Sequence, residues 1–385
     1  MKYAFFITLM ILWLLSLIYS IKRGSQLLSE NSKIKIIYKS LMIIGFLAFL
    51  SAMLMQELMP LPIAQIVEFV GYSYLILAAY LFGAFVFTDI ISFLHKKFKW
   101  KGNIIRIRQA TISLMLAAII ISMIIGNIKY HNPDIINLNI KSNKNINFNK
   151  NNIENKDLKI VAISDVHLGA LIGKSKLKEY VEMINAQKPD IVLIAGDLVD
   201  RLLKPINEQN LHEELRQIKA PMGVFAVFGN HEYYGGDYGK DRKLLMDFYR
   251  KSNITLLRDS VAMIDSTIYI VGRDDHSNHQ RKQLSALTKN LDNSKFIILL
   301  DHQPWELQEA EQCKVDLQLS GHTHAGQLFP GNLLIKNMYE NPHGYSRRGN
   351  TQYYVSSGLG LWGPPYRIGT NSELINIRLT KAPSN

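Results

Sequence analysis

The sequence predicts a transmembrane region of four helices followed by an α/β domain, a layered β-sheet sandwich flanked by helices. Two observations predict this fold class. Apolar runs of about 20 residues, the length that crosses a bilayer, occur only before residue ~130 of the 385. Beyond them, short apolar runs of strand length alternate with amphipathic helical patterns, as in a sheet that helices cover on both faces.

Four apolar segments form the predicted transmembrane region, residues 1–128. We expect helices at about 3–21, 36–56, 69–88 and 110–128. The first segment is open to interpretation as a signal peptide. Because its apolar run is long and no small-x-small cleavage site follows, we expect an uncleaved helix.

Basic residues are unevenly distributed among the loops of this region. The loop after the first helix carries Lys22, Arg23, Lys33 and Lys35, and residues 95–108 hold six Lys or Arg and no acid. The loop at 56–65 has Glu57 and no Lys or Arg. Because positive loops stay in the cytoplasm, we expect both chain ends outside. The protein would be integral to a bacterial plasma membrane, with an extracytoplasmic C-terminal domain.

The charge and the cysteine content limit the classes of partner and cofactor site that the chain is expected to have. The formal net charge is +12, but many basic residues flank apolar runs, where membrane orientation explains them better than nucleic-acid binding does. The expected partner is therefore the lipid bilayer and not nucleic acid. The single cysteine, Cys313, excludes an intramolecular disulfide framework and a cysteine-based zinc cluster. The sequence does not fix an oligomeric state.

Residues 129–157 connect the two parts and are rich in Asn, Lys and Ile. This composition suits a flexible tether, whereas the alternation in "INLNI" also permits a strand. We expect a linker that ends in an edge strand, followed by a globular domain over residues 158–385.

Apolar runs and helical patterns alternate within that domain. The apolar runs predict strands at 158–164, 191–196, 223–229, 267–272, 295–300 and 315–320. The amphipathic patterns predict helices at 174–187, 207–218 and 240–252.

Polar clusters follow five of these strands. The clusters are Asp165–His167, Asp197, Asn230–His231, Asp301–His302 and His322–His324. Layered α/β sheets place their ligand sites at the carboxyl ends of strands, so the clusters can converge on one rim. Burying so many ionisable groups together is costly without a cation. Imidazole and carboxylate ligands favour Mn, Fe, Zn, Co or Ni, and so many ligands with one shared carboxylate suit two ions about 3.5–4 Å apart.

The motifs resemble those of the calcineurin-like metallophosphoesterases. They are "SDVHLG" (164–169), "GDLVD" (196–200), "GNHE" (229–232), "DH" (301–302) and "SGHTHAGQ" (320–327), in the order of that family. The resemblance covers residues ~158–380. The segment at 356–379 is also similar to the end of the membrane-associated YkuE/YaeI-like branch, which often has Pro-Glu where this chain has Ser372-Glu373.

This resemblance implies the calcineurin-like metallophosphoesterase fold and a pair of divalent cations. It assigns Asp165, His167, Asp197 and His324 to the first cation, and Asn230, His302 and His322 to the second, with Asp197 shared. The two histidines of "HTH" would then each reach a different cation, and Gly321 would let the backbone approach the ions.

The same resemblance implies a catalytic role for His231. It would lie near the scissile phosphate, as a proton donor to the leaving group or as a stabiliser of the developing charge. Purple acid phosphatases carry Tyr where this chain has Asp200, so that subtype is disfavoured. Asp200 is expected to form a hydrogen bond with a neighbouring group.

We therefore expect a membrane-anchored phosphoesterase that acts on a phosphodiester or phosphomonoester, such as a lipid or another cell-envelope component. The reaction would be in-line attack of a metal-bound hydroxide on phosphorus. Two alternatives remain open. A membrane sensor or scaffold with a regulatory phosphoesterase domain would be expected to have a damaged metal site. A nuclease would lose activity steeply as salt rises.

Overall fold

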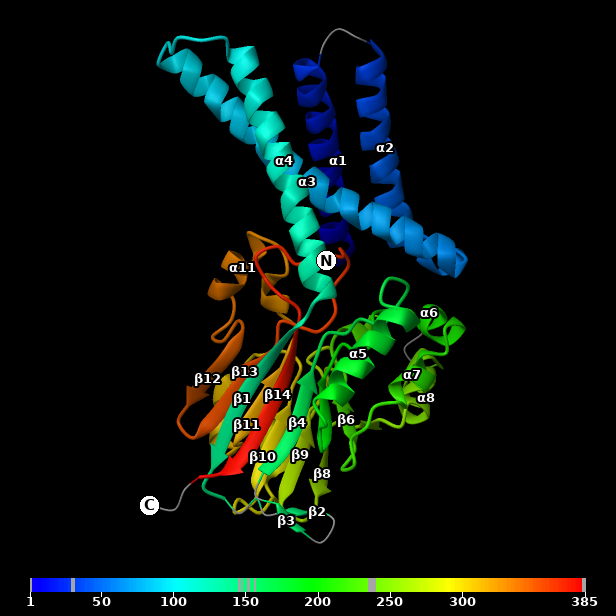
Figure 1. The fold of residues 1–385 in the computed structure, drawn as a ribbon, viewed down its shortest axis with the longest axis vertical. Helices are drawn as coiled ribbons and strands as arrows, with labels where there is room; N and C mark the ends of the chain where they lie inside the picture. Colours follow the sequence, from blue (N-terminus) through cyan, green and yellow to red (C-terminus); the bar gives the residue numbers. More distant parts are fainter. Residues whose placement is uncertain are drawn as a thin grey trace. The chain divides into compact units, whose positions relative to one another are not determined.

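The computed structural model describes residues 2–28, 32–144, 146, 148–150, 153–155, 157–234 and 240–382 (Figure 1). Its internal contacts divide the chain into two units. One unit comprises Met1–Gly126 with Gly363–Pro365, and the other comprises Asn127–Trp362 with Tyr366–Asn385.

Long helices make up the first unit. They are α1 (Lys2–Leu27), α2 (Ser32–Leu54), α3 (Leu61–Lys97) and most of α4 (Ile104–His131), with the 3₁₀ turn η1 (Gln56–Leu58) between α2 and α3. Three helices in the described residues are long and apolar enough to cross a membrane: Lys33–Leu54, Leu61–Lys97 and Ile104–His131. The count is therefore three where the sequence predicts four. The first predicted segment falls in α1, and the side chains of residues 1–6 and 9 lie outside the described part.

Apolar side chains point outward from these helices. Ile37, Leu41 and Leu114 are 59%, 64% and 73% exposed. A continuous apolar surface of this kind is suited to lipid, where backbone polar groups must be satisfied within the helix. The four long helices are longer than the sequence predicts, because helical hydrogen bonds continue through the polar residues that flank each apolar run. α3, for example, starts with a proline in its first turn and ends at Lys97.

Two six-stranded sheets form the second unit. The first sheet has the order β1 (Asp134–Ser142), β14 (Glu373–Lys381), β4 (Asp157–Ile163), β5 (Ile191–Ala195), β6 (Val224–Val227) and β7 (Thr255–Leu256). The second has the order β12 (Gly344–Arg348), β13 (Thr351–Val355), β11 (Leu317–Ser320), β10 (Phe296–Leu300), β9 (Ile268–Gly272) and β8 (Ser260–Ile264). Strands β2 (Phe148–Lys150) and β3 (Ile153–Asn155) pair with each other.

Helices and short turns connect the strands. They are α5 (Lys174–Ala186), α6 (Leu203–Glu208), α7 (Leu211–Leu215), α8 (Lys240–Lys251), α9 (Leu284–Thr288), α10 (Leu307–Gln312) and α11 (Gly331–Leu334), and the 3₁₀ turns η2 (His231–Tyr233), η3 (His324–Gly326) and η4 (Ile335–Asn337). The single helix predicted at 207–218 is wrong, since α6 and α7 replace it. Asn210, with φ of 51°, separates them, and asparagine tolerates this left-handed conformation.

Apolar layers hold the sandwich together. Side chains from the facing sides of the two sheets, such as Ile160 of β4 and Ile298 of β10, form one buried cluster. The outer face of the first sheet packs on α5, α7 and α8, and the outer face of the second packs on α9 and α10. The predicted layered α/β sandwich is confirmed (Figure 1).

Strand β1 lies at the edge of the first sheet, parallel to β14. It contains the alternating segment 136–140, and it begins at Asp134, shortly after α4 ends at His131. The assignment of residues 129–157 to a linker with an edge strand, and of the domain to 158–385, stays a prediction.

Candidate metal centre

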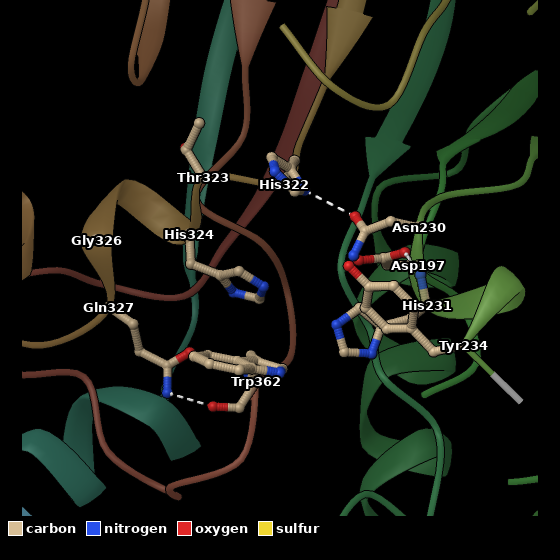
Figure 2. A pocket seen from close by; sticks show the side chains of 10 residues that line it. All are labelled: Asp197, Asn230, His231, Tyr234, His322, Thr323, His324, Gly326, Gln327 and Trp362. Carbon is tan, nitrogen blue, oxygen red and sulfur yellow. Dashed lines mark hydrogen bonds between the residues drawn. The ribbon is translucent and has the colours of Figure 1, made fainter. Parts of the chain in front are cut away.

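Five strand ends carry the polar clusters, and the topology brings them together. β4, β5 and β6 are parallel neighbours in the first sheet, and β10 and β11 are parallel neighbours in the second. Their carboxyl ends therefore open on the same rim of the sandwich. Figure 2 shows side chains from both sheets facing one pocket.

One group of possible metal ligands joins the end of β4 to the turn after β11. Ligand atoms of Asp165, His167 and His324 lie within 4.8 Å of one another. The Nε2 atoms of His167 and His324 are 3.1 Å apart, and His324 Nε2 is 3.4 Å from Asp165 Oδ1. Two imidazole nitrogens and a carboxylate oxygen thus point at a common space.

A second group joins both sheets. Ligand atoms of Asp197, His302 and His322 also lie within 4.8 Å of one another. Asn230 belongs with them, because its Oδ1 is 3.2 Å from His302 Nε2 and 2.7 Å from His322 Nδ1. Asp197 Oδ2 is 3.1 Å from His302 Nε2.

Asp197 lies between the two groups. The carboxylate oxygen that contacts His302 is also 3.8 Å from His167 Nε2 in the first group. All seven side chains that the sequence singles out as ligands are thus close together, with Asp197 positioned to serve both groups. Each group offers only nitrogen and oxygen donors, which suit divalent transition metals.

The charge balance of the site also fits cations. Asp165 and Asp197 are 0% and 1% exposed. Within the described part of the chain, neither carboxylate has an ion pair with Lys or Arg. Burial raises the pKa of Asp197, but the charges of His302 and His231 outweigh this and hold that pKa well below its usual value. Buried carboxylates are stable only beside compensating charge, which a bound divalent ion provides.

The ring orientations favour metal binding as well. His302 Nδ1 lies 2.7 Å from the carbonyl oxygen of Ala195, so Nδ1 donates a hydrogen bond and Nε2 faces the ligand group. Metal-binding histidines usually have such a partner for the other ring nitrogen. Burial lowers the pKa of His322 to about 4 and the pKa of His324 well below its usual value. Both rings are therefore neutral, as metal coordination requires.

Backbone conformation at the site is strained. Asp165, His167, Asp197, His322 and His324 all have positive φ angles, between 49° and 71°. Non-glycine residues adopt this left-handed region at a cost, and such strain gathers at functional sites. Glycine is needed beside them: a Cβ on Gly321 would collide with the Asp165 carboxylate, and one on Gly196 would lie 2.5 Å from His302 Nδ1. Gly321 therefore makes room for a carboxylate, a more specific role than closeness to the ions.

His231 has a charged partner that the sequence motif did not identify. Its Nδ1 is 2.6 Å from Asp200 Oδ1, while its backbone N–H donates to Asp197 Oδ1 at 2.9 Å. Burial lowers the pKa of His231, but the carboxylates of Asp197 and Asp200 outweigh burial and raise that pKa to about 9. The imidazole is thus protonated at neutral pH and able to donate a proton.

Two buried side chains position the ligand turns. The Glu232 carboxylate accepts the backbone N–H groups of Asp197 at 3.1 Å, Val199 at 2.9 Å and Gly229 at 2.7 Å. It therefore joins the turns after β5 and β6. No sequence signal beyond its place in "GNHE" indicated this role.

The second buried side chain that positions the ligand turns is Arg367, which is 0% exposed. Its guanidinium donates to the carbonyl oxygens of His324 at 3.0 Å, Gly358 at 3.1 Å and Gly360 at 2.7 Å. Gly360 N–H in turn donates to the carbonyl oxygen of Asp165 at 3.0 Å. Arg367 thus connects the backbone of two first-group residues. By contrast, Asp301 turns away toward Arg273 and Arg281, at 3.4 and 3.2 Å, and supports the turn before His302.

A pocket of about 330 Å³ opens over the site (Figure 2). Its lining residues are Asp197, Asn230, His231, Tyr234, His322, Thr323, His324, Gly326, Gln327 and Trp362. The volume is in the range of small-molecule sites. His231 and members of both ligand groups therefore face this pocket, namely His324 of the first, Asn230 and His322 of the second, and the shared Asp197.

Comparison with known proteins agrees with this geometry. Residues 158–326 match the family model described as calcineurin-like phosphoesterase. A Helicobacter pylori protein named "Uncharacterized metallophosphoesterase" is 38% identical over 230 residues, which cover 58% of this chain and 60% of that protein. A Danio rerio protein named "Transmembrane protein with metallophosphoesterase domain" is 36% identical over 246 residues, 58% of this chain and 54% of the relative.

A Bacillus subtilis relative is covered more fully. It is named "Uncharacterized metallophosphoesterase YkuE" and is 32% identical over 231 residues, which cover 56% of this chain and 77% of the relative. Metallophosphoesterases of this family use a dinuclear metal centre, and the two ligand groups described above could hold metal ions. The chain has apolar helices long enough to cross a membrane and belongs to the calcineurin-like metallophosphoesterase family.

Proposed function

We propose that this protein is a membrane-anchored, dinuclear metal-dependent phosphoesterase. The observation that carries the proposal is the meeting of seven donor side chains from five strand ends around the Asp197 carboxylate. Asp165, His167, Asp197 and His324 would hold one divalent ion, and Asp197, Asn230, His302 and His322 the other. The donor set suits Mn, Fe, Zn, Co or Ni.

The chain's own residues complete the chemistry. Divalent ions at such a site supply positive charge to phosphoryl oxygens and lower the pKa of water. His231 lies beside Asp197 at the pocket, and its hydrogen bond to Asp200 keeps it protonated and fixes its ring. It is the proton donor to the leaving-group oxygen in an in-line displacement at phosphorus, and general acid catalysis contributes ~10²–10⁴-fold in rate.

The substrate is a phosphate ester, and the membrane anchor favours one at the membrane surface, such as a lipid-linked or cell-envelope ester. A sensor or scaffold with an inactive domain is the weaker alternative, because none of the seven expected ligands is replaced in the sequence. A nuclease is also weaker, since most of the net positive charge lies beside the apolar helices: residues 1–131 hold 13 Lys or Arg and four Asp or Glu, a net +9 of the total +12.

Activity on two chromogenic esters tests the function. Full-length protein loaded with Mn²⁺ should hydrolyse p-nitrophenyl phosphate or bis-p-nitrophenyl phosphate. His231→Ala should keep its metal and lose most of the rate. Loss of metal together with activity would remove His231 from the proton-donor role, and no hydrolysis of either ester by the wild type would overturn the function.

We further propose that the catalytic domain is extracytoplasmic, in a bacterial plasma membrane. The distribution of Lys and Arg supports this orientation. Asp89 of α3 pairs with Arg23 at 2.6 Å and with Arg108 at 3.0 Å, so the basic ends of α1 and α4 lie at the same end of the helical unit. Both are expected on the cytoplasmic side. A C-terminal alkaline phosphatase fusion should be active, whereas activity only from a cytoplasmic reporter would reverse the orientation.

A further inference from the structure

The pocket over the ligand groups has little positive charge of its own. None of its ten described lining residues is Lys or Arg. Sites that act on phosphoryl groups commonly add Arg or Lys to offset charge. A phosphomonoester carries about −1.5 to −2 charges at pH 7, and beyond the proposed metal ions and His231 this lining offers no cationic side chain for its second charge.

An exposed tryptophan stands at the side of this pocket. Trp362 is 59% exposed, although its backbone is fixed. The Gln327 side chain donates to the Trp362 carbonyl oxygen at 3.0 Å and accepts the Trp362 N–H at 3.0 Å. Gln327 is itself buried and belongs to the turn that carries His324. The chain therefore holds an indole ring at the pocket from the same turn that holds a ligand.

A second aromatic ring lies on the other side. Tyr234 is 59% exposed and its ring centroid is 5.0 Å from that of His231. Figure 2 shows Trp362 with Gln327 on one side of the pocket and Tyr234 with His231 on the other. Exposed aromatic rings at a pocket offer apolar contact area to a ligand. A phosphodiester has two ester groups to occupy two such sides, whereas a monoester has one.

We propose that this pocket selects a phosphodiester monoanion and that Trp362 packs against an ester group with an apolar or planar face. The inference rests on the phosphoesterase function proposed above and names its substrate class. A nucleoside diester and a glycerolipid diester share this chemistry.

Ester preference is measured with full-length, Mn²⁺-loaded protein. The ratio of kcat/KM for bis-p-nitrophenyl phosphate to that for p-nitrophenyl phosphate should exceed about tenfold, and both esters release the same leaving group. A preference for the monoester would overturn the inference while leaving the phosphoesterase function intact. Hydrolysis of neither ester would instead overturn the function itself.

Variants test the role of the indole. Trp362→Ala should raise KM for bis-p-nitrophenyl phosphate about tenfold with little change in kcat, since a stacking contact of this kind is worth about a factor of ten or more. Trp362→Phe should restore KM to within about twofold. Trp100→Ala, which removes a comparably exposed tryptophan of the helical unit, is the matched control and should behave as wild type. An unchanged KM in Trp362→Ala would overturn the role of Trp362.

Binding without turnover gives an independent readout. Diphenyl phosphate should change the tryptophan emission of the wild type and of Trp100→Ala, but not that of Trp362→Phe. Dimethyl phosphate, with the same charge and no ring, should have no effect. An equal response in wild type and Trp362→Phe would contradict the inference.

The source of the diester is distinguished with two natural-type substrates. Thymidine 5′-(p-nitrophenyl) phosphate represents the nucleoside source, and phosphatidylglycerol in nanodiscs represents the lipid source. Hydrolysis of either one that weakens in Trp362→Ala supports the inference and names the source. Hydrolysis of neither would contradict it.

Discussion

Replacing Asp200 by Asn tests whether His231 works as part of a pair. Asp200 Oδ1 accepts a hydrogen bond from His231 Nδ1 at 2.6 Å, and with Asp197 and Glu232 this carboxylate raises the pKa of His231 to about 9. A hydrogen bond to a charged partner is worth about 1.5–3 kcal/mol. Asparagine is nearly isosteric but neutral, so the variant loses that stabilisation of the protonated ring.

The expected loss follows from this magnitude. Since about 1.4 kcal/mol corresponds to tenfold in rate, kcat should fall roughly 10–100-fold. The assay is steady-state hydrolysis of bis-p-nitrophenyl phosphate by full-length protein, with metal content measured on the same preparations. Metal content should stay at the wild-type level. In a His231→Ala background, Asp200→Asn should have no further effect, because the two residues act through one proton transfer.

Two results would refute this reasoning. Asp200 and His231 also form a possible ligand group with His167, whose Nδ1 is 3.6 Å from Asp200 Oδ1. If Asp200→Asn lost metal, Asp200 would be a ligand and not a positioning residue. If the effects of Asp200→Asn and His231→Ala multiplied, the two side chains would act separately.

Three further predictions follow from the buried contacts. Arg367→Lys should weaken Mn²⁺ binding about tenfold or more, since lysine cannot make all three carbonyl contacts. Arg378→Lys, at an exposed position, should bind Mn²⁺ as the wild type does. Isothermal titration measures both affinities, and equal values for the two variants would contradict the role of Arg367. In EDTA, the free energy of unfolding should fall as pH rises from about 6.5 through about 9, because a histidine whose pKa is higher in the folded state stabilises it fully only below its unfolded value. Urea titrations at several pH values should show this fall in the free energy of unfolding, on the order of 1–3 kcal/mol in total. The fall should be smaller in His231→Gln, and an equal fall in that variant would assign the pH dependence to another group. Glu232→Ala should lower the melting temperature of the metal-free protein, because the buried N–H groups of Asp197, Val199 and Gly229 lose their acceptor. Each unpaired N–H group costs about 1–3 kcal/mol of stability. An unchanged melting temperature would contradict the role of Glu232 in joining the two turns.

Much of the sandwich could be predicted from local apolar runs. β4, β5, β6, β9, β10 and β11 each coincide with a predicted strand, because both faces of these strands are buried and their sequences are almost wholly apolar. β7, β8 and β12, at sheet edges, have mixed or exposed faces and were not predicted, and the mostly buried β13 and β14 were not predicted either. Strands at sheet edges give a weaker pattern because one face meets solvent.

Convergence of the seven ligands could also be anticipated, because carboxyl ends of parallel strands meet at one rim. The contacts that support these seven ligands could not be anticipated from the sequence. Asp200 meets His231 across 31 positions, and Arg367 meets His324 across 43, with no periodic pattern to connect them. The positive φ angles at five of the proposed ligands likewise arise from tertiary packing that overrides local preference.

Metal stoichiometry of the full-length protein tests the central claim most directly. The wild type, reconstituted with Mn²⁺ and passed through a desalting column, should retain two ions per chain by elemental mass spectrometry. Asp197→Asn should lose both, because its carboxylate lies between the two ligand groups. A wild-type preparation that retains no transition metal, or an Asp197→Asn variant that still holds two ions, would contradict the shared dinuclear site.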